Sequence, residues 1–401
     1  MDEQRLQAYY QLIESLLNCP NGEEPEILAA NTELLDAGFL QILKAVAQHF
    51  SQQGDKNTAN WLKNLATELS NALNLPTTSQ ASDETSITSE DIEVYGQFLL
   101  QVLRTTAESN GNPQVIYPLL AANTDKLNPI FTELLRRWAT NTLTEAETDT
   151  ARSVAAVIGN FSNLIQQFPL GSKANNMEIA LACYEIIETV YTLNAFPQDW
   201  ATTQNNLGAA YSNRITGERA ENIEQAIAAY EQALLVRTHN AFPQDWAATQ
   251  NNLGAAYSNR ITGERAENIE QALAAYTKAL EVRTKSAFPQ QWATTQNNLG
   301  NAYSNRITGE RAENIEQALA AYTKALEVYT KSAFPQDWAM TQNNLGAAYR
   351  NRITGKRAEN IEQAIAAYTK ALEVYTKSAF PQDWAMTQNN LGAAYRNRIT
   401  G

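Results

Sequence analysis

One asparagine recurs at the same place in five near-identical segments of the C-terminal half, every 46 residues: Asn205, Asn251, Asn297, Asn343 and Asn389. A carboxamide offers two N–H donors and a carbonyl acceptor. A row of such groups could hydrogen-bond the backbone of an extended peptide whatever its side chains. Each bond contributes about 0.5–1.5 kcal/mol net, so several in series support micromolar binding. A solvated polar face is the alternative interpretation.

Three further positions are predicted to share this face, and they vary between repeats. The first reads Thr202, Ala248, Thr294, Met340 and Met386, and the second reads Ala209, Ala255, Asn301, Ala347 and Ala393. The third reads Ser212, Ser258, Ser304, Arg350 and Arg396. The two arginines make the C-terminal end of the face basic, so we predict a preference for acidic side chains or a terminal carboxylate there. Free drift of exposed residues is the other explanation of this variation.

A strict repeat must position these residues. The string AFPQDW, with Gln in place of Asp once, puts its Phe at 196, 242, 288, 334 and 380. A constant period of this length predicts a solenoid, in which each unit buries its apolar face against its neighbours. Pro197 suits the first turn of a helix. Trp200, Leu207, Tyr211 and Ile215 then fall on one apolar stripe, and Gly217 offers a left-handed stop.

A second helix follows in each unit. Asn222 with Gln225 is typical of a capping box at its start, and Ile223, Ala226 and Tyr230 fall on one face of it. Gly208 lies inside the first helix at a cost of about 1 kcal/mol relative to Ala and recurs in every repeat. This predicts a close helix approach at Gly208, with a flat alanine surface opposite. The sequence therefore predicts antiparallel helix pairs and an all-α fold.

The order Leu207-Gly208, Tyr211, Ala226, Tyr230, Ala233 resembles the tetratricopeptide repeat signature, although the period is longer than is usual there. The long units with paired Asn before Leu-Gly are similar to kinesin-light-chain repeats and to cyanobacterial arrays that accompany caspase-like CHAT peptidase domains. The resemblance implies a right-handed superhelix that binds protein ligands in a concave groove lined by first helices. It places any catalytic residues of such an effector beyond Gly401.

Further boundaries follow from the same register. Residues 150–195 are predicted to be a degenerate capping repeat, followed by the array over 196–401, whose last repeat is incomplete. We expect this end to continue in a longer chain or to stack on another molecule. Helices are predicted over 1–75 and 91–149, joined by a flexible linker over 76–90. Matches at an offset of 92 residues, such as AANT at 29–32 and 121–124, suggest that these two segments are diverged copies.

Composition narrows the function classes. Residues 1–150 hold 21 Asp and Glu against 8 Lys and Arg, while the remainder is balanced, so the whole net charge of −13 lies in the first part. Nucleic-acid binding is not expected of such a chain. We find no apolar leader, no membrane span, no metal or cofactor motif and no catalytic motif. We expect a cytoplasmic protein that is not an enzyme, with no metal and no cofactor.

The sequence therefore predicts a protein- or peptide-binding scaffold. The sensory or regulatory portion of a larger effector, such as a CHAT-type peptidase, is one alternative. A self-assembling structural array is the other. If the asparagine row contacts the ligand, replacing Asn251 and Asn297 by Ala should weaken ligand capture without lowering the melting temperature.

Overall fold

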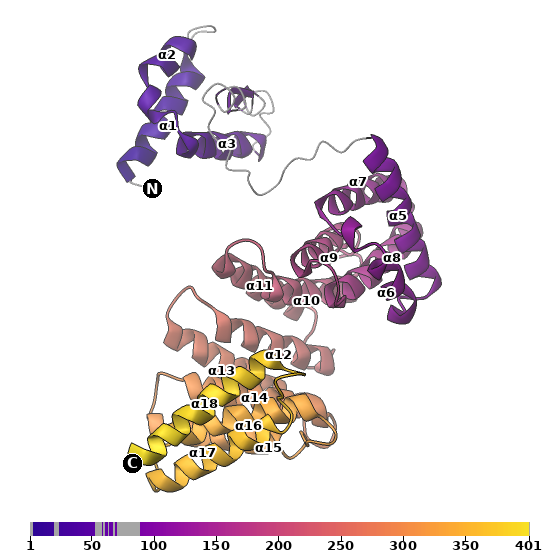
Figure 1. Ribbon diagram of the computed structural model, residues 1–401. Helices are drawn as coiled ribbons and strands as arrows, with labels where there is room; N and C mark the ends of the chain where they lie inside the picture. Colours follow the sequence, from indigo (N-terminus) through magenta and orange to yellow (C-terminus); the bar gives the residue numbers. More distant parts are fainter. Residues whose placement is uncertain are drawn as a thin grey trace. The chain divides into compact units, whose positions relative to one another are not determined.

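The computed structural model describes residues 3–19, 24–52, 58, 61–62, 64–66, 69 and 89–400. Every regular element in these ranges is a helix (Figure 1). The chain divides into two compact units, Met1–Thr88 and Ser89–Gly401. The predicted linker over 76–90 falls almost wholly outside the described residues.

The first unit contains α1 (Glu3–Asn18), α2 (Glu24–Ala30), the short 3-10 helix η1 (Thr32–Leu34) and α3 (Ala37–Gln52). Tyr9 of α1 and Phe39 of α3 lie at the centre of its core, with their rings 5.8 Å apart. The Tyr9 hydroxyl also donates to Asp36, just before α3. These contacts fix the angle between α1 and α3.

The second unit begins with α5 (Ser89–Glu108), α6 (Pro113–Ala121), the 3-10 helix η2 (Thr124–Lys126) and α7 (Pro129–Glu145). Its elements repeat those of the first unit at an offset of 92: η1 and η2 coincide, and α3 and α7 start at equivalent residues. Leu35 and Leu127, which end the two 3-10 helices, share φ −82° and ψ 74°. A diverged copy would produce this likeness.

Five helix pairs then follow in order, and a single first helix comes after them. The degenerate pair is α8 (Thr148–Gln167) and α9 (Lys173–Glu188). First helices of the array are α10 (Pro197–Asn213), α12 (Pro243–Asn259), α14 (Pro289–Asn305), α16 (Pro335–Asn351) and α18 (Pro381–Thr400). Second helices are α11 (Arg219–Leu234), α13 (Arg265–Val282), α15 (Arg311–Ala325) and α17 (Arg357–Leu372).

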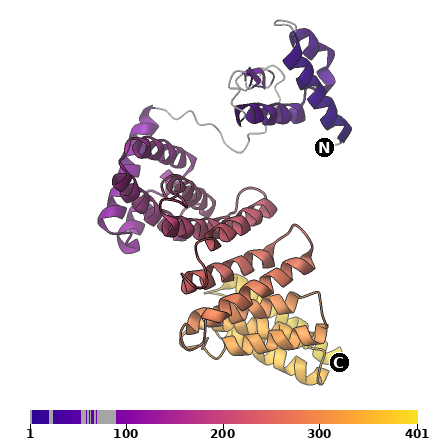
Figure 2. The same cartoon turned by 180° about the vertical axis from the view of Figure 1, so that it is seen from behind.

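Each of α10, α12, α14 and α16 packs on the second helix of its own repeat and on that of the preceding repeat, and α18 packs on α17. The pairs therefore stack in sequence order along the array, which both faces of the ribbon show (Figures 1 and 2). This is an α-solenoid, as predicted. Pro197 occupies the first turn of α10, and Gly217 adopts φ +73° in the loop after it, also as predicted.

Two details of the predicted helices are wrong. Ile215 lies past the end of α10 and is 57% exposed, so it is outside the apolar stripe. Asn222 does not cap α11, which starts at Arg219. The buried Asn222 amide instead donates to the Thr216 carbonyl at 2.8 Å and so closes the loop between the two helices.

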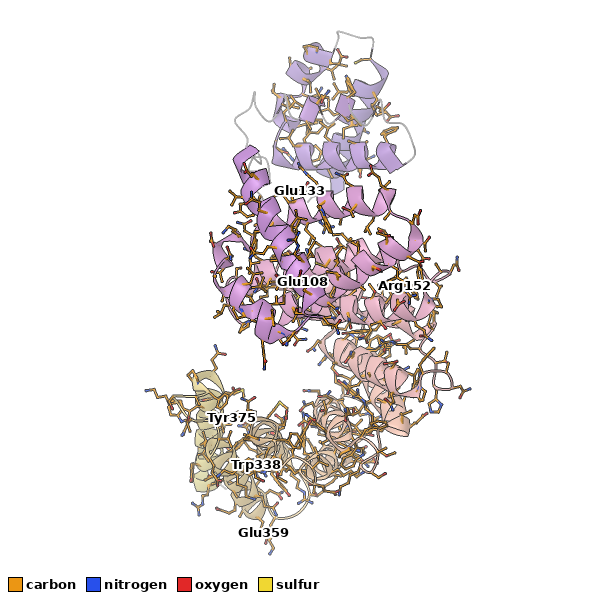
Figure 3. The ribbon with its side chains drawn as sticks, turned by 90° about the vertical axis from the view of Figure 1, so that its right-hand side faces the viewer. Glu108, Glu133, Arg152, Trp338, Glu359 and Tyr375 are labelled. Atoms are coloured by element: carbon orange, nitrogen blue, oxygen red, sulfur yellow. The ribbon has the colours of Figure 1, made fainter. Side chains whose placement is uncertain are left out.

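Aromatic clusters join successive repeats near the start of each first helix. Trp338 packs against Tyr375 at the end of the second helix of its repeat (Figure 3). The ring of Phe380, which precedes the next first helix, meets Tyr375 edge-on at 5.7 Å. The repeated Phe and Trp thus serve the junction between repeats.

Candidate peptide-binding groove

The first helices form one continuous surface of the array. Each of α10, α12, α14 and α16 contacts the next first helix directly, whereas contacts between successive second helices are weaker. Elements that lie closer together occupy the inner side of a curved stack, so the first helices line the inner face. We call this face the groove.

In each complete repeat, a glycine of the first helix packs against a tyrosine ring of the second helix. A Cβ on Gly208 would lie 2.7 Å from a ring carbon of Tyr230, and one on Gly300 would lie 2.6 Å from Tyr322. The close approach predicted at Gly208 is therefore present, but its partner is an aromatic ring rather than an alanine surface. The tyrosine hydroxyl is brought to the groove side of the first helix by this packing.

An arginine–glutamate pair fixes the far end of each first helix. Arg306, just after α14, donates Nε and Nη2 to Glu270 of the preceding second helix at 2.7 and 3.0 Å. Thr308 adds a hydroxyl contact to the same carboxylate. The hydrogen bond from Arg306 lowers the pKa of Glu270, although burial opposes the shift. Equivalent ion pairs occur at Arg214–Glu178, Arg260–Glu224, Arg352–Glu316 and Arg398–Glu362.

The asparagine row lies between the first helices rather than open to the groove. Asn251, Asn297 and Asn343 are buried, at 8%, 2% and 7% exposure, whereas Asn389 is exposed and Asn205 is half-buried. The prediction of a row facing solvent is therefore wrong for the three central members.

Hydrogen bonds explain this burial. The Asn251 amide oxygen accepts from the Thr295 hydroxyl at 3.1 Å and from the Asn298 amide at 3.3 Å, both on the next first helix. Asn205 and Asn297 repeat both bonds with the residues 44 and 47 positions further on, and Asn343 repeats the second. The oxygens of these four asparagines therefore join successive first helices and are not open to a ligand.

The first variable position does face outward. Thr202 is exposed, Met340 is 39% exposed and Met386 is 49% exposed. Ala248 and Thr294 are half-buried, and the Thr294 hydroxyl lies 2.6 Å from that of Tyr329. This position changes from hydroxyl to thioether along the array, so the groove becomes more apolar toward α18.

The other two variable positions surround the tyrosine hydroxyls. Tyr322 donates to Asn301 at 2.7 Å and lies 3.3 Å from the Ser304 hydroxyl. In the next repeat Ala347 and Arg350 replace these two residues, and the buried hydroxyl of Tyr368 has no hydrogen-bond partner among the described residues. The second and third positions therefore decide whether a buried hydroxyl is satisfied. Ser212 and Ser258 are half-buried, and Arg396 is exposed.

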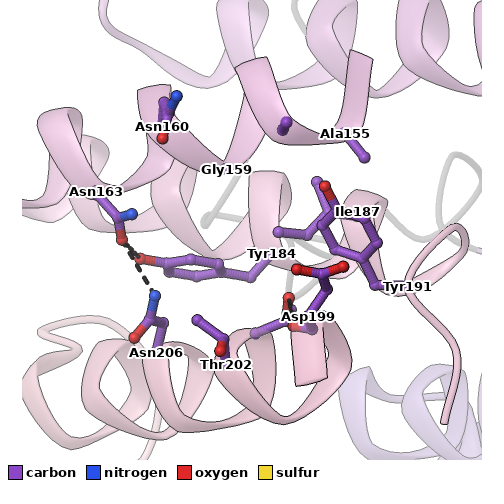
Figure 4. Close-up of a pocket in the computed structure, with 12 residues that line it drawn as sticks. Ala155, Gly159, Asn160, Asn163, Tyr184, Ile187, Tyr191, Asp199, Thr202 and Asn206 are labelled. Carbon is purple, nitrogen blue, oxygen red and sulfur yellow. Dashed lines mark hydrogen bonds between the residues drawn. The ribbon is translucent and has the colours of Figure 1, made fainter. Parts of the chain in front are cut away.

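A pocket of about 210 Å³ opens where the degenerate pair meets α10 (Figure 4). Gly159 lines this pocket together with Thr203 and stands 46 residues before Asn205, at the place of the row asparagine. Asn206 donates instead to Asn163, which also accepts from Tyr184. In later repeats a row asparagine stands at the place of Gly159. We call this place between consecutive first helices a niche in every repeat.

Sequence reasoning missed the residue that closes each niche. It follows the second helix and reads Tyr191, Arg237, Arg283, Tyr329 and Tyr375. Arg237 is 7% exposed and donates to Thr249 at 3.1 Å and to Thr202 at 3.0 Å. Burial lowers the pKa of Arg237, and the Asp245 carboxylate opposes that shift. The change from Arg to Tyr between otherwise similar repeats was the available signal.

Stacked antiparallel helix pairs with an inner face of first helices define the class of helical-repeat scaffolds. Within that class, four segments of the chain match the Tetratricopeptide repeat family, over residues 200–239, 246–284, 292–329 and 338–375. These segments of the array are similar to tetratricopeptide repeats, a family that generally mediates protein–protein interactions and is typically not catalytic.

The other comparisons add little. The crystal structure of BtubC (BKLC) from P. vanneervenii is similar over 72% of this chain and 92% of that chain, with 18% identity and a TM-score of 0.35. A score this low carries no argument about function. Comparison with curated proteins gave no match.

Two searches of the described ranges bear on other sites. No cluster of three His, Cys, Asp or Glu side chains suited to a metal ion was found there. None of the helices in those ranges combines the length and the apolar character that crossing a membrane requires.

Proposed function

We propose that the array binds a protein or an extended peptide in the groove formed by α10, α12, α14, α16 and α18. One observation carries this proposal. In repeats that are otherwise nearly identical, first-helix substitutions gather at positions that reach the groove, and they include the exposed Met340 and Met386. Exposed thioethers adapt to varied apolar surfaces, which suits a binding face.

The basic end of the groove is proposed to select acidic ligands. Arg350 lies near the buried Tyr368 hydroxyl, which makes no hydrogen bond to the described residues. Arg350 is itself half-buried, and its guanidinium could pair with a ligand carboxylate. Arg396 contributes a second cation one repeat further on. The acidic N-terminal region of the same or another copy remains a candidate ligand.

The asparagine row has a narrower role in this proposal than the sequence suggested. The oxygens of Asn205, Asn251, Asn297 and Asn343 are engaged within the array. The exposed Asn389 is therefore the member of the row that we propose contacts a ligand through its whole amide.

The experiment is a pull-down from the native host with the full chain, compared with a variant that carries Met340→Thr and Arg350→Ser. Both substitutions install the residue found at the same position of the third repeat, so the fold should persist. Selective loss of captured proteins supports the groove. Identical captured proteins with both chains would show that binding occurs elsewhere.

Self-association is a second candidate. A Cβ on Gly392 of α18 would meet nothing within 4 Å, unlike its four equivalents, which lie under tyrosine rings. Tyr395 is 43% exposed on the same helix, so we propose that α18 can take a second helix from another copy. Light scattering across concentration tests this, and a constant mass that Tyr395→Glu leaves unchanged would exclude it.

Two further proposals depend on the sequence alone. Similarity to CHAT-associated arrays suggests the regulatory portion of a larger effector, which sequencing the gene past codon 401 tests. A cytoplasmic location is proposed from the composition, and a fluorescent fusion in the native host tests it.

A further inference from the structure

Two successive niches hold an arginine, and the two arginines differ in the partners that surround them. Arg237 donates to Thr202 and Thr249, and the Asp245 carboxylate lies close enough to act on it. Arg283 occupies the same place one repeat later and donates through Nη1 to Thr295 at 3.0 Å. This is its single hydrogen bond to the described residues, although a guanidinium carries five N–H donors.

The sequence explains what Arg283 lacks. Ala248 stands where Thr202 accepts from Arg237, and Gln291 stands where Asp245 faces Arg237. Gln291 is the one departure from Asp in five copies of the AFPQDW string. Both changes therefore fall around the same guanidinium. Ala248 removes a hydroxyl acceptor, whereas Gln291 keeps an amide oxygen and removes the negative charge.

No other described niche has a cation without a carboxylate. The first pairs Asp199 with Arg152 at 3.5 Å beneath Tyr191. The last two hold tyrosines beside Asp337 and Asp383. Arg283 is half-buried, and burial lowers its pKa, because a charge removed from water without a counter-ion is disfavoured.

We propose that the niche between α12 and α14 binds a ligand carboxylate, held by Arg283 and by the exposed amide of Gln291. This rests on the proposed groove function and adds a central anionic anchor to it. The planar guanidinium pairs with a carboxylate through two parallel hydrogen bonds. The ligand oxygens would replace the Asp carboxylate and Thr hydroxyl that the preceding niche supplies from the chain itself.

Two substitutions provide a matched test. Gln291→Asp restores the carboxylate found in the other repeats, and Ala248→Thr restores the hydroxyl, so the double variant reproduces the niche of Arg237. The side-chain Nε–H signals of Arg283 and Arg237 are followed by NMR as sodium acetate is added to the full chain. The signals are assigned by their loss in Arg283→Gln and Arg237→Gln.

We expect a saturating shift at Arg283, none at Arg237, and acetate affinity about tenfold lower in the double variant. A linear, equal response of both arginines would overturn the inference. A second arm uses immobilised peptides in three forms: acidic side chains with an amidated end, neutral side chains with a free terminal carboxylate, and neutral side chains with an amidated end. Retention of the first or second form identifies the source of the carboxylate.

The two arms separate the two proposals. Saturable acetate binding at Arg283 without retention of any peptide would keep the anion site and count against peptide binding. Retention of all three forms alike, unchanged in the double variant, would keep the groove and reject the anion site.

Discussion

The amide oxygen of Asn251 accepts a hydrogen bond from the hydroxyl of Thr295, 44 residues further along the chain, at 3.1 Å. Thr295 is fully buried and Asn251 is nearly so. This bond joins two first helices that have no covalent connection nearby. The asparagine that sequence reasoning assigned to a ligand is therefore part of the joint between repeats.

Replacing Asn251 by Ala should lower the free energy of unfolding by about 0.5–1.5 kcal/mol, since the Thr295 hydroxyl and the Asn298 amide lose the acceptor that they share. The Thr295 hydroxyl can still donate to the Gln291 carbonyl at 2.9 Å, which limits the loss. The melting temperature measures this. Asn389→Ala is the control, because Asn389 is exposed and should change stability by less than about 0.5 kcal/mol. Equal melting temperatures for Asn251→Ala and the wild type would refute the structural role.

Gly300 and Gly392 are equivalent in sequence but differ in surroundings. Gly300→Ala would place a Cβ 2.6 Å from Tyr322, and such overpacking costs about 1–3 kcal/mol. Gly392→Ala meets nothing within 4 Å and should stabilise α18 by up to about 1 kcal/mol through helix propensity. Chemical denaturation of both variants measures whether the free energy of unfolding falls for Gly300→Ala and rises for Gly392→Ala. A shift in the same direction would contradict the packing described.

The hydroxyls of Tyr322 and Tyr368 form a second matched pair. Tyr322→Phe removes a hydrogen bond to Asn301 and should cost about 1 kcal/mol. Tyr368→Phe removes a buried hydroxyl that has no partner, so stability should stay constant or rise. The melting temperatures of the two variants test this difference. A larger loss of stability for Tyr368→Phe than for Tyr322→Phe would show that the Tyr368 hydroxyl is hydrogen-bonded.

Because of the arginine–glutamate pairs, we expect the stability of the folded protein to fall at acidic pH. The pKa of Glu270 is lowered from its ordinary 4.5, mainly by Arg306. A lowered carboxyl pKa in the folded state adds stability above the ordinary value, and this is lost as pH falls through the lowered one. The pair is about one-third exposed, so its contribution is about 0–1 kcal/mol.

Melting temperatures of the wild type and Glu270→Gln should therefore differ most near neutral pH and converge below about pH 4.5. Glu267→Gln, on the same helix but outside any ion pair of the described structure, serves as the control. A difference between wild type and Glu270→Gln that is independent of pH would refute the ion-pair explanation.

The sequence predicted the repeat, the helix pairs and the first turn at Pro197 because these depend on local pattern. It misplaced the asparagine row because angular position on a helix identifies the side away from the partner, not what lies there. In a stacked array that side of α12 partly faces α14. The invariant Thr at 203, 249, 295, 341 and 387, two residues before each row asparagine, was the overlooked signal.

The niche residues were missed for a different reason. Arg283 and Gln291 lie eight positions apart around a loop, and their pairing depends on how two helices meet. Only comparison of Arg283 with Arg237, whose partners are visible in the structure, shows what is absent. Near-identical repeats make that comparison possible within one chain.

The uniform joints between first helices have a consequence for the length of the array. Asn205, Asn251 and Asn297 each meet the same two partners on the following helix. An added or deleted block of 46 residues would therefore find matching contacts on both sides. Unequal crossing-over between such similar gene segments would lengthen or shorten the groove in whole steps without disturbing the neighbouring repeats.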